Sequence, residues 1–326
     1  MIDKLFLEKN GYTYRNVLGE GMYGKVVCAY STHQKQRVAI KIVDTKKLHS
    51  DSWEIFLSRE MEIVKSLNHP NIVKTYRILD MKKSRTVYMV MELCVKGNLS
   101  TYVTSEGSLS EHSSCRLFTQ LCEAIQYLHN RDLVHRDLKC DNLLLDMYLN
   151  LKVGDFGFSK RLIYMDSHMK LSETYCGSLS YTAPEVLIHS PYNPKVSDVW
   201  SMGVVLYRML YGSMPFNSTN LLKMVEAQKQ HRITFPNSPT VSSEAQHLIQ
   251  SILHPTVEWR ITIGNILQSS WMLKRGRMED SHEASTSSTG SRQEEPQNKN
   301  AREDMEVQHD NSDLGEGPST AAEKLK

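Results

Sequence analysis

One short segment of the chain carries three side chains with complementary chemistry, Asp137, Lys139 and Asn142. A carboxylate can orient an attacking hydroxyl, an ammonium can neutralise a phosphoryl group in transfer, and a carboxamide oxygen can hold a metal ion. A second carboxylate follows at Asp155, before Phe156 and Gly157. Together, this order and spacing favours Mg²⁺-assisted phosphoryl transfer. Asp137 and Lys139 are then the candidate catalytic residues, and Asn142 and Asp155 the candidate metal ligands.

A glycine-rich stretch near the N-terminus is the candidate phosphate-binding loop, because glycines let backbone N–H groups approach phosphates. It comprises Leu18, Gly19, Glu20, Gly21, Met22, Tyr23, Gly24, Lys25 and Val26. A dinucleotide-binding fold would continue with a helix. Here a strand-like segment follows and leads to Ala39 and Lys41, so an ammonium beneath a glycine flap is expected. The alternative is a glycine hairpin beside a solvated lysine.

The elements that must position these residues differ between the two parts of the chain. Up to about residue 93, strand-like segments surround one helical segment, which offers Glu60 or Glu62 as partner for Lys41. The expected strands are 14–18, 25–30, 37–43, 76–79 and 87–91, and the helix is 53–67. Beyond Leu99 the expected helices are 113–130, 195–211, 221–230 and 242–253. The second of these contains the most apolar run, 204–210, which Arg208 interrupts. A ligand is expected between the two parts.

Composition and charge exclude several classes of protein. Hydrophobic residues make up 40% of the 326 residues and the net charge is +2, so neither nucleic acid nor a membrane surface is an expected partner. The six cysteines form no CxxC pair, which favours reduced thiols in the cytosol or nucleus. The charged N-terminus does not resemble a signal peptide, and no apolar run reaches the ~18 residues that span a bilayer.

The C-terminal segment differs in amino-acid composition from the rest of the chain. Residues 274–326 lack aromatic residues and contain 12 acidic and 8 basic side chains. Such a segment cannot bury enough apolar surface to offset its ordering entropy, so a disordered, acidic, Ser-rich tail is expected over 273–326. The alternative to a merely solvating tail is a regulatory one, since hydroxyl residues cluster at 285–289. Residues 1–11 are interpreted as an N-terminal extension and 12–272 as the catalytic domain.

These motifs, with Ala183-Pro184-Glu185, Asp198 and Arg260, resemble the signature of the eukaryotic protein kinases. The resemblance implies an α+β bilobal fold, with a small β-rich lobe containing one main helix and a larger helical lobe. It implies ATP and Mg²⁺ as cofactors and, through Lys139, transfer to serine or threonine of protein substrates. Glu60 becomes the preferred partner of Lys41. Met91 resembles the gatekeeper, and the backbone of Glu92 and Cys94 is expected to bind adenine.

The same resemblance assigns structural roles to three polar residues. Glu185 and Arg260 are expected to form a buried ion pair, and Asp198 to brace the backbone of the catalytic loop. His135 is expected to pack rather than to catalyse.

A closer resemblance is to the testis-specific serine/threonine kinases within the calmodulin-dependent-kinase-like group. The segments 135–146, 155–161, 191–216 and 223–236 carry it. It implies a role in male germ cells, in spermatid differentiation or sperm function, with heat-shock chaperones as partners. The implied location is the cytoplasm, with sperm structures or the nucleus as further compartments. An AMP-activated-kinase-like signalling kinase and a pseudokinase scaffold are the alternatives.

The segment 158–182 corresponds to the activation loop. Thr174 resembles the activating phosphorylation site, with Ser172 as runner-up, and an upstream kinase is an implied partner. Arg136 and Lys160 could bind the phosphate. Ser178 is expected to donate its hydroxyl to the Asp137 and Lys139 pair.

Two departures from the family bear on the substrate. Leu179 replaces the usual proline, and Asn98 replaces an acidic residue that faces the ribose and a basic substrate residue. With Asp141 as the remaining acidic contact, a weaker preference for arginine upstream of the target is expected. Cys94 and Cys176 are expected to be inert thiols.

Overall fold

The structure is a computed structural model that describes residues 2–21, 24–45, 51–81 and 85–274, with only the backbone for 51–56 and 81. The chain divides into two units, 1–283 and 284–326, and every residue described below belongs to the first. The expected tail, 273–326, lies outside the described residues except for Leu273 and Lys274.

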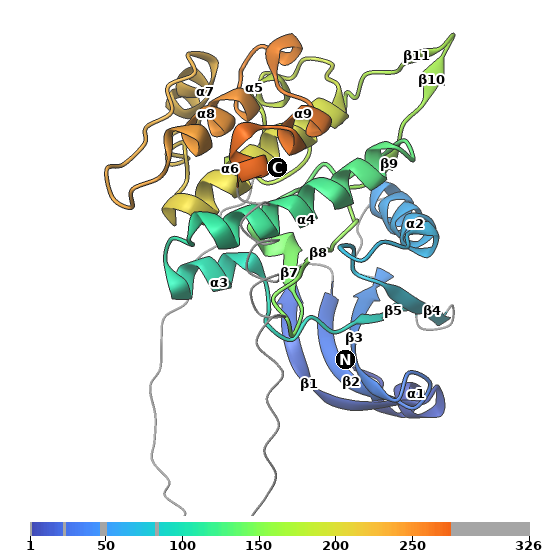
Figure 1. Ribbon diagram of the computed structural model, residues 1–326. Coiled ribbons are helices and arrows are strands. Elements are labelled where there is room, and N and C mark those ends of the chain that lie inside the picture. The colour runs from blue at the N-terminus through green and yellow to red at the C-terminus, as the bar shows by residue number, and fades with distance from the viewer. Residues whose placement is uncertain (1, 22–23, 46–50, 82–84, 275–326) are drawn as a thin grey trace, which may run out of the picture. The chain divides into compact units, whose positions relative to one another are not determined.

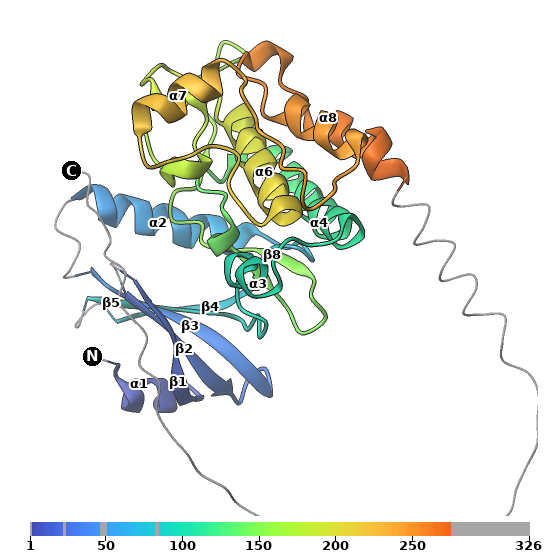
Figure 2. The same cartoon turned by 90° about the vertical axis from the view of Figure 1, so that its left-hand side faces the viewer.

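The small lobe is an antiparallel sheet of five strands in the order β1-β2-β3-β5-β4 (Figure 1). The strands are β1 (Tyr12–Gly21), β2 (Gly24–Ser31), β3 (Gln36–Asp44), β4 (Thr75–Met81) and β5 (Thr86–Glu92). The helix α2 (Asp51–Ser66) follows β3 and lies between the sheet and the helical part of the chain (Figure 2). The expected strand-rich lobe with one main helix is therefore confirmed.

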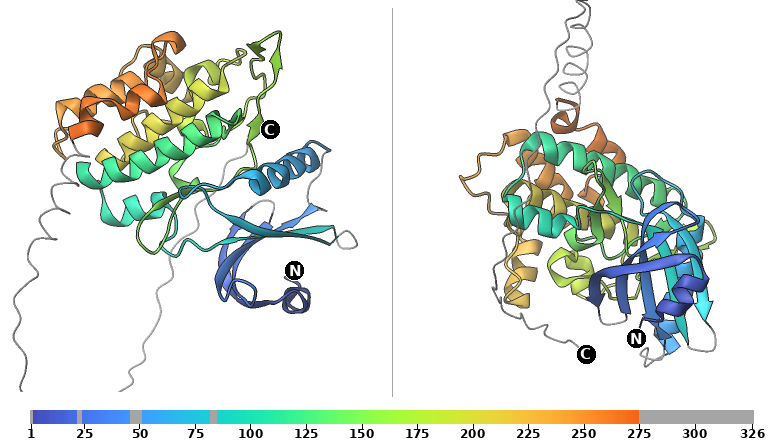
Figure 3. Two further views of the ribbon diagram at one scale, coloured as in Figure 1. Left: turned by 45° about the vertical axis from the view of Figure 1, so that its right-hand side comes forward. Right: turned by 90° about the horizontal axis from the view of Figure 1, so that it is seen from below.

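The large lobe is mainly helical. Its helices are α3 (Leu99–Glu106), α4 (Glu111–His129), α5 (Pro184–Leu187), α6 (Pro194–Tyr211), α7 (Leu221–Lys229), α8 (Ser243–Ile252) and α9 (Ile263–Leu267). Short 3₁₀ turns lie at Cys140–Asn142, Leu179–Tyr181 and Val257–Trp259. Three short antiparallel pairs join β6 (Leu133–Val134) to β9 (Lys160–Arg161), β7 (Leu143–Leu145) to β8 (Leu151–Val153), and β10 (Tyr164–Met165) to β11 (His168–Met169). The last pair projects away from the helices (Figure 3).

Helix α6 is the centre of the large lobe, where it packs against α4 and α8. Apolar side chains surround almost its whole circumference and are buried, as expected for a helix enclosed by other elements. Its ends are fixed locally. Asn193 caps the first turn by accepting from the Lys195 N–H, Pro194 occupies the first position, and Gly212 ends the helix with a φ of 69°. This rigid helix supports the catalytic loop.

The two faces of the small-lobe sheet have different neighbours. Successive side chains of a strand point to opposite faces, so residues two apart share one. On β2, β3 and β5 one face carries Cys28, Ala39, Lys41, Met89 and Met91, which line a cavity. The other face carries a buried apolar set: Val27, Ala29, Val38, Ile40, Ile42, Tyr88 and Val90. The sheet is therefore covered on both sides.

Part of the N-terminal extension covers the second face. Residues Lys4–Lys9 form the helix α1, which Asp3 caps by accepting from the Phe6 N–H at 2.9 Å. Leu7 is fully buried in the apolar set, and the rings of Phe6 and Tyr88 lie 4.9 Å apart. Figure 3 shows α1 against the sheet. The extension thus contributes to the core of the small lobe.

This packing predicts unequal effects for two leucines of α1. Leu7→Ala should lower the free energy of unfolding by about 2–4 kcal/mol, because it leaves a cavity in the buried set. Leu5→Ala is the matched control, since Leu5 is 62% exposed, and should change stability by less than about 0.5 kcal/mol. Urea unfolding of the full chain measures both. Equal, small effects would contradict the packing role of α1.

Candidate active site

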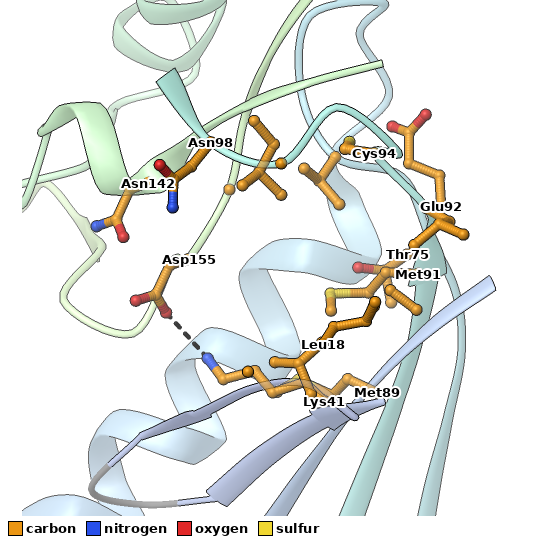
Figure 4. A pocket seen from close by; sticks show the side chains of 18 of the residues that line it. Leu18, Lys41, Thr75, Met89, Met91, Glu92, Cys94, Asn98, Asn142 and Asp155 are labelled. Atoms are coloured by element: carbon orange, nitrogen blue, oxygen red, sulfur yellow. Dashed lines mark hydrogen bonds and ion pairs between the residues drawn. The ribbon is translucent and has the colours of Figure 1, made fainter. Parts of the chain in front are cut away.

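A lysine with two carboxylate partners lies where the lobes meet. Lys41 Nζ on β3 is 2.6 Å from Glu60 Oε1 on α2. It is also 2.9 Å from Oδ1 of Asp155, a residue that follows β8, and Figure 4 shows this second contact. Glu60 is buried whereas Glu62 is exposed, so the structure selects Glu60 between the two expected partners. One ammonium thus joins the sheet, the helix and the large lobe.

The charges of this group stabilise one another. Burial lowers the pKa of Lys41, but the attraction of Glu60 and Asp155 outweighs it, so the pKa lies above its ordinary value. The Lys41 charge in turn holds the pKa of Asp155 below its usual range, although burial opposes the shift. Both shifts favour the charged forms of Lys41 and Asp155 at neutral pH.

The catalytic loop brings its polar residues together as the sequence predicted. Lys139 Nζ lies 3.0 Å from Asp137 Oδ2, and the Ser178 hydroxyl donates to Asp137 Oδ1 at 2.9 Å while accepting from Lys139 at 2.8 Å. Asn142 Nδ2 donates to the Asp137 carbonyl at 2.9 Å and to its Oδ2 at 3.1 Å. These contacts fix the positions of both carboxylate oxygens of Asp137.

A buried carboxylate explains why the loop keeps this shape. Asp198, on α6 and 1% exposed, accepts from the backbone N–H groups of His135 at 3.0 Å and Arg136 at 2.8 Å. It also bonds His129 Nε2 at 2.9 Å. Burial raises the pKa of Asp198, but these hydrogen bonds and the nearby imidazoles lower it by a larger amount, so the pKa lies below its usual value. Arg136 has a φ of 65°, a strained value for a residue with a side chain, and Asp198 holds it there.

The roles expected for His135, Glu185 and Arg260 are also confirmed. His135 is fully buried, bonds the Gly154 carbonyl through Nε2 at 3.0 Å and packs edge-on against Phe156. Arg260 forms a two-point pair with Glu185 at 2.6 and 3.0 Å. These contacts position the loop and the following segment.

A cavity of about 570 Å³ separates the lobes and contains most of the predicted ligand-binding residues. Those that line it are Leu18, Gly19, Val26, Ala39, Lys41, Glu60, Met91, Glu92, Cys94, Asn142 and Asp155. Figure 4 shows Lys41 and Asp155 at one end and Cys94 and Glu92 at the other. The wall also includes residues that the sequence interpretation missed, among them Asn16, Cys28, Val64, Val73, Thr75, Met89 and Leu144.

Four residues of the glycine-rich stretch do not line the cavity, and two others, Met22 and Tyr23, lie outside the described residues. Glu20 and Lys25 form an exposed ion pair of 3.0 Å across the hairpin. A Cβ at Gly24 would lie 1.9 Å from the Ile42 carbonyl oxygen, so this glycine permits close packing of β2 on β3. A Cβ at Gly19 or Gly21 would meet nothing within 4 Å, and of these two glycines Gly19 lines the cavity.

The segment that joins the lobes presents backbone groups to the cavity. The Glu92 N–H donates to the Lys74 carbonyl at 2.9 Å, and the Glu92 carboxylate pairs with Lys152 at 2.9 Å. The Cys94 N–H has no acceptor among the described residues, whereas its carbonyl accepts from Gly97. Burial raises the pKa of the Cys94 thiol to about 12 and also raises that of Cys176, consistent with inert thiols.

The activation loop exposes Thr174 and buries Ser172, which is 2% exposed. The Tyr192 hydroxyl donates to the Thr174 carbonyl at 2.9 Å. Arg136 donates through Nε to the Phe158 carbonyl, and its Nη1 is buried with no acceptor among the described residues. Burial and then the positive charges of Arg136, Arg59 and Lys170 lower the pKa of Lys160. The activation loop therefore lies beside a cluster of cations.

Asn98 differs from its expected role in one respect. Its Oδ1 caps helix α3 by accepting from the Thr101 N–H at 2.8 Å. Although Asn98 lines the cavity, its amide nitrogen is the part left to meet a ligand. The residue is a neutral donor there instead of an acidic acceptor.

The oxygen donors of Asp155 and Asn142 suit Mg²⁺, which needs few protein ligands, better than a metal ion whose ligands all come from the protein. No group of three or more His, Cys, Asp or Glu that could hold a metal occurs in the described part of the chain. Asp155 has one carboxylate oxygen left beside the Lys41 contact, and the Asn142 oxygen lies on the Asp155 side in Figure 4. Mg²⁺ often takes few protein oxygens and completes its shell with phosphates and water. The pair fits that requirement.

Comparisons with known proteins agree with this geometry. The family model described as protein kinase domain matches residues 12–272. Testis-specific serine/threonine-protein kinase 1 of Mus musculus is 47% identical over 91% of this chain and 81% of the relative. The human kinase of that name is 48% identical over the same shares, and kinase 2 of Mus musculus is 48% identical over 83% and 76%. Among helices of the described residues, none has the length and hydropathy needed to cross a membrane.

Proposed function

The chain belongs to the protein kinase family, in its testis-specific serine/threonine branch, and on this premise we propose how its residues perform the reaction. It is a serine/threonine protein kinase, and protein kinases in general use ATP and Mg²⁺. One observation carries the assignment of roles. The Lys41–Glu60–Asp155 group lines the cavity between the lobes, and Asn142, which also lines it, donates to Asp137 of the Asp137–Lys139–Ser178 network.

Asp137 orients the hydroxyl of the acceptor serine or threonine and accepts its proton. Lys139 beside it neutralises charge on the transferring phosphoryl group. Ser178 holds these two side chains in register through its two hydrogen bonds. Lys41, kept in place by Glu60, contacts the phosphates of ATP. The nucleotide lies under residues 18–26, and the backbone of Glu92 and Cys94 binds adenine beside Met91.

Asn142 and Asp155 are the residues that would hold Mg²⁺. When bound, the metal neutralises negative charge on the phosphates and orients them for in-line transfer. The Lys41 contact positions the Asp155 carboxylate for this purpose. The alternative of a pseudokinase scaffold is disfavoured, because the four residues that such proteins lack are present and in contact in pairs. Lys41 contacts Asp155, and Asn142 contacts Asp137.

The names of the relatives support a role in male germ cells, in spermatid differentiation or sperm function. They favour this role over an AMP-activated-kinase-like one. Protein substrates are implied by the family, and heat-shock chaperones are proposed as partners on the resemblance alone. The proposed location is the cytoplasm, with sperm structures or the nucleus as further compartments.

The role of Asp137 predicts a loss of phosphoryl transfer. Asp137→Asn should lower the rate of γ-phosphate transfer from ATP to a generic protein substrate by about 10²–10⁴-fold, since the hydroxyl loses its base. Asp80→Asn, a substitution on an exposed residue of β4, is the control and should leave the rate unchanged. Transfer that survives in Asp137→Asn would sink the assignment.

We further propose that phosphorylation of Thr174 by an upstream kinase activates the enzyme. Thr174 is exposed, and the unsatisfied Arg136 Nη1 together with Lys160 and Arg59 supplies cations for a phosphate beside the loop. Arg59 precedes Glu60 on α2, so a phosphate bound there would also steady the helix that holds Lys41. Ser172 is disfavoured because its side chain is buried.

This proposal predicts that the activity of Thr174→Ala is at least about tenfold lower than that of fully phosphorylated wild type, because charge-assisted bonds that order the loop are lost. Phosphatase treatment should bring wild type down to the same level. Ser172→Ala is the comparison variant and should still respond to the upstream kinase. Activity of Thr174→Ala equal to that of phosphorylated wild type, verified by mass spectrometry, would rule the proposal out.

A further inference from the structure

Arg208 is a charged residue that the mechanism above does not use. It lies in the last turn of α6, whose neighbouring side chains Tyr207, Met209 and Leu210 are buried and non-ionic. A cation is favourable at a helix C-terminus, which alone could account for its presence. Its contacts indicate a more specific role.

Among the described residues, the guanidinium of Arg208 donates only to neutral groups. Nη1 donates to the Tyr181 hydroxyl at 3.2 Å and to Met214 Sδ at 3.8 Å, and Nη2 donates to the Ser100 hydroxyl at 3.0 Å. Nε is buried and has no acceptor among the described residues. Arg260, by contrast, has a two-point carboxylate partner in Glu185. The charge of Arg208 is thus left without a paired anion in the described part of the chain.

Two of these partners, Tyr181 and Ser100, connect Arg208 to the surroundings of the catalytic loop and of the cavity. Tyr181 ends the turn that begins next to Ser178, whose hydroxyl bonds the catalytic base. Ser100 lies in the first turn of α3, two residues after Asn98 on the cavity wall. Arg208 therefore lies between the catalytic-loop side and α3, and it is partly exposed.

The acidic residue near Arg208 is Asp141 in the catalytic loop. Burial lowers the pKa of Arg208, but the influence of Tyr181, Cys140 and Asp141 outweighs it and raises the pKa. Asp141 is exposed, and no ion pair joins it to Arg208 among the residues described. The neutral Asn98 adds no negative charge. Within the described ranges, the charge of Arg208 is therefore not balanced by a paired carboxylate.

We propose that Arg208 is a specificity-determining residue that selects acceptor segments carrying an aspartate, a glutamate or a phosphorylated residue close to the target serine or threonine. The inference rests on the proposed function, since it names the substrate class of that same site. A carboxylate or phosphate of the substrate supplies the anion that the guanidinium lacks, in charge-assisted hydrogen bonds to the exposed part of the group. It extends the weakened preference for arginine that Asn98 implies into a positive preference for acid.

The test is a positional peptide array with the full chain, ATP and Mg²⁺. A serine acceptor flanked by alanines is the reference, and each flanking position is replaced in turn by Asp, Glu, phosphoserine or Arg. Wild type should show one position at which an anion raises kcat/KM about fivefold or more over the reference. This ratio should fall as salt is added, because the site is partly exposed. The phosphoserine and carboxylate arms show which anion is favoured.

Variants assign the preference to the residue. In Arg208→Gln the ratio of anionic to reference peptide should fall to about one, in Arg208→Glu it should invert in favour of Arg, and in Arg208→Lys it should persist in part. Arg232→Gln is the matched control, since the Arg232 side chain is 59% exposed and pairs with Glu226 on the surface. It should keep the wild-type ratio.

The outcomes separate the inference from the proposed function. Absence of transfer to every peptide would overturn the proposed function and the inference with it. Transfer to the reference without a preferred anionic position in wild type would overturn the inference alone, whether or not the variants fold. An acid preference that persists in Arg208→Gln would do the same.

Discussion

The active site depends first on the contact of Lys41 with Glu60 and Asp155, because this contact joins three different segments of the chain. The ammonium belongs to the sheet, one carboxylate to α2 and the other to the segment after β8. Removing one partner from a partly buried group of this kind leaves a charge uncompensated and costs several kcal/mol, about 3–5 in buried cases. A shift of α2 or of the lobes would therefore break the group. Its presence indicates that the elements around the cavity are arranged for phosphate binding.

The other half of the site depends on the rigidity of α6. Asp198 extends from this buried helix to the backbone of His135 and Arg136, and holds Arg136 in a left-handed conformation. The loop then presents Asp137, and Ser178 fixes it against Lys139. Arg208 extends from the same helix toward the acceptor side. A single apolar helix thus supports the catalytic loop and, in the proposal made above, contributes to the choice of substrate.

Local pattern predicted much of this arrangement and missed what depends on distant pairing. The long helices follow from periodicity, whereas the Glu60, Ser178 and Asp198 contacts were implied by the resemblance to protein kinases. Membership of Cys28 and Met89 in the cavity wall depends on strand register, since both faces of β2 and β5 are apolar. The helix α1 is too short to show a recognisable helical periodicity in the sequence, and it is stabilised by the sheet that it covers. Arg208 looked like an interruption of an apolar run until its neighbours were known.

The central claim is that the Lys41–Glu60 contact is needed for phosphoryl transfer, and two glutamates of α2 that lie two positions apart test it most directly. Glu60 is buried against Lys41, whereas Glu62 faces solvent. The measurement is kcat/KM for ATP with a peptide acceptor in Glu60→Gln and Glu62→Gln, both checked for folding by thermal unfolding. We predict a loss of about ten- to a hundredfold in Glu60→Gln, because the ammonium loses a charged partner, and little change in Glu62→Gln. Equal activity of the two folded variants would contradict the account.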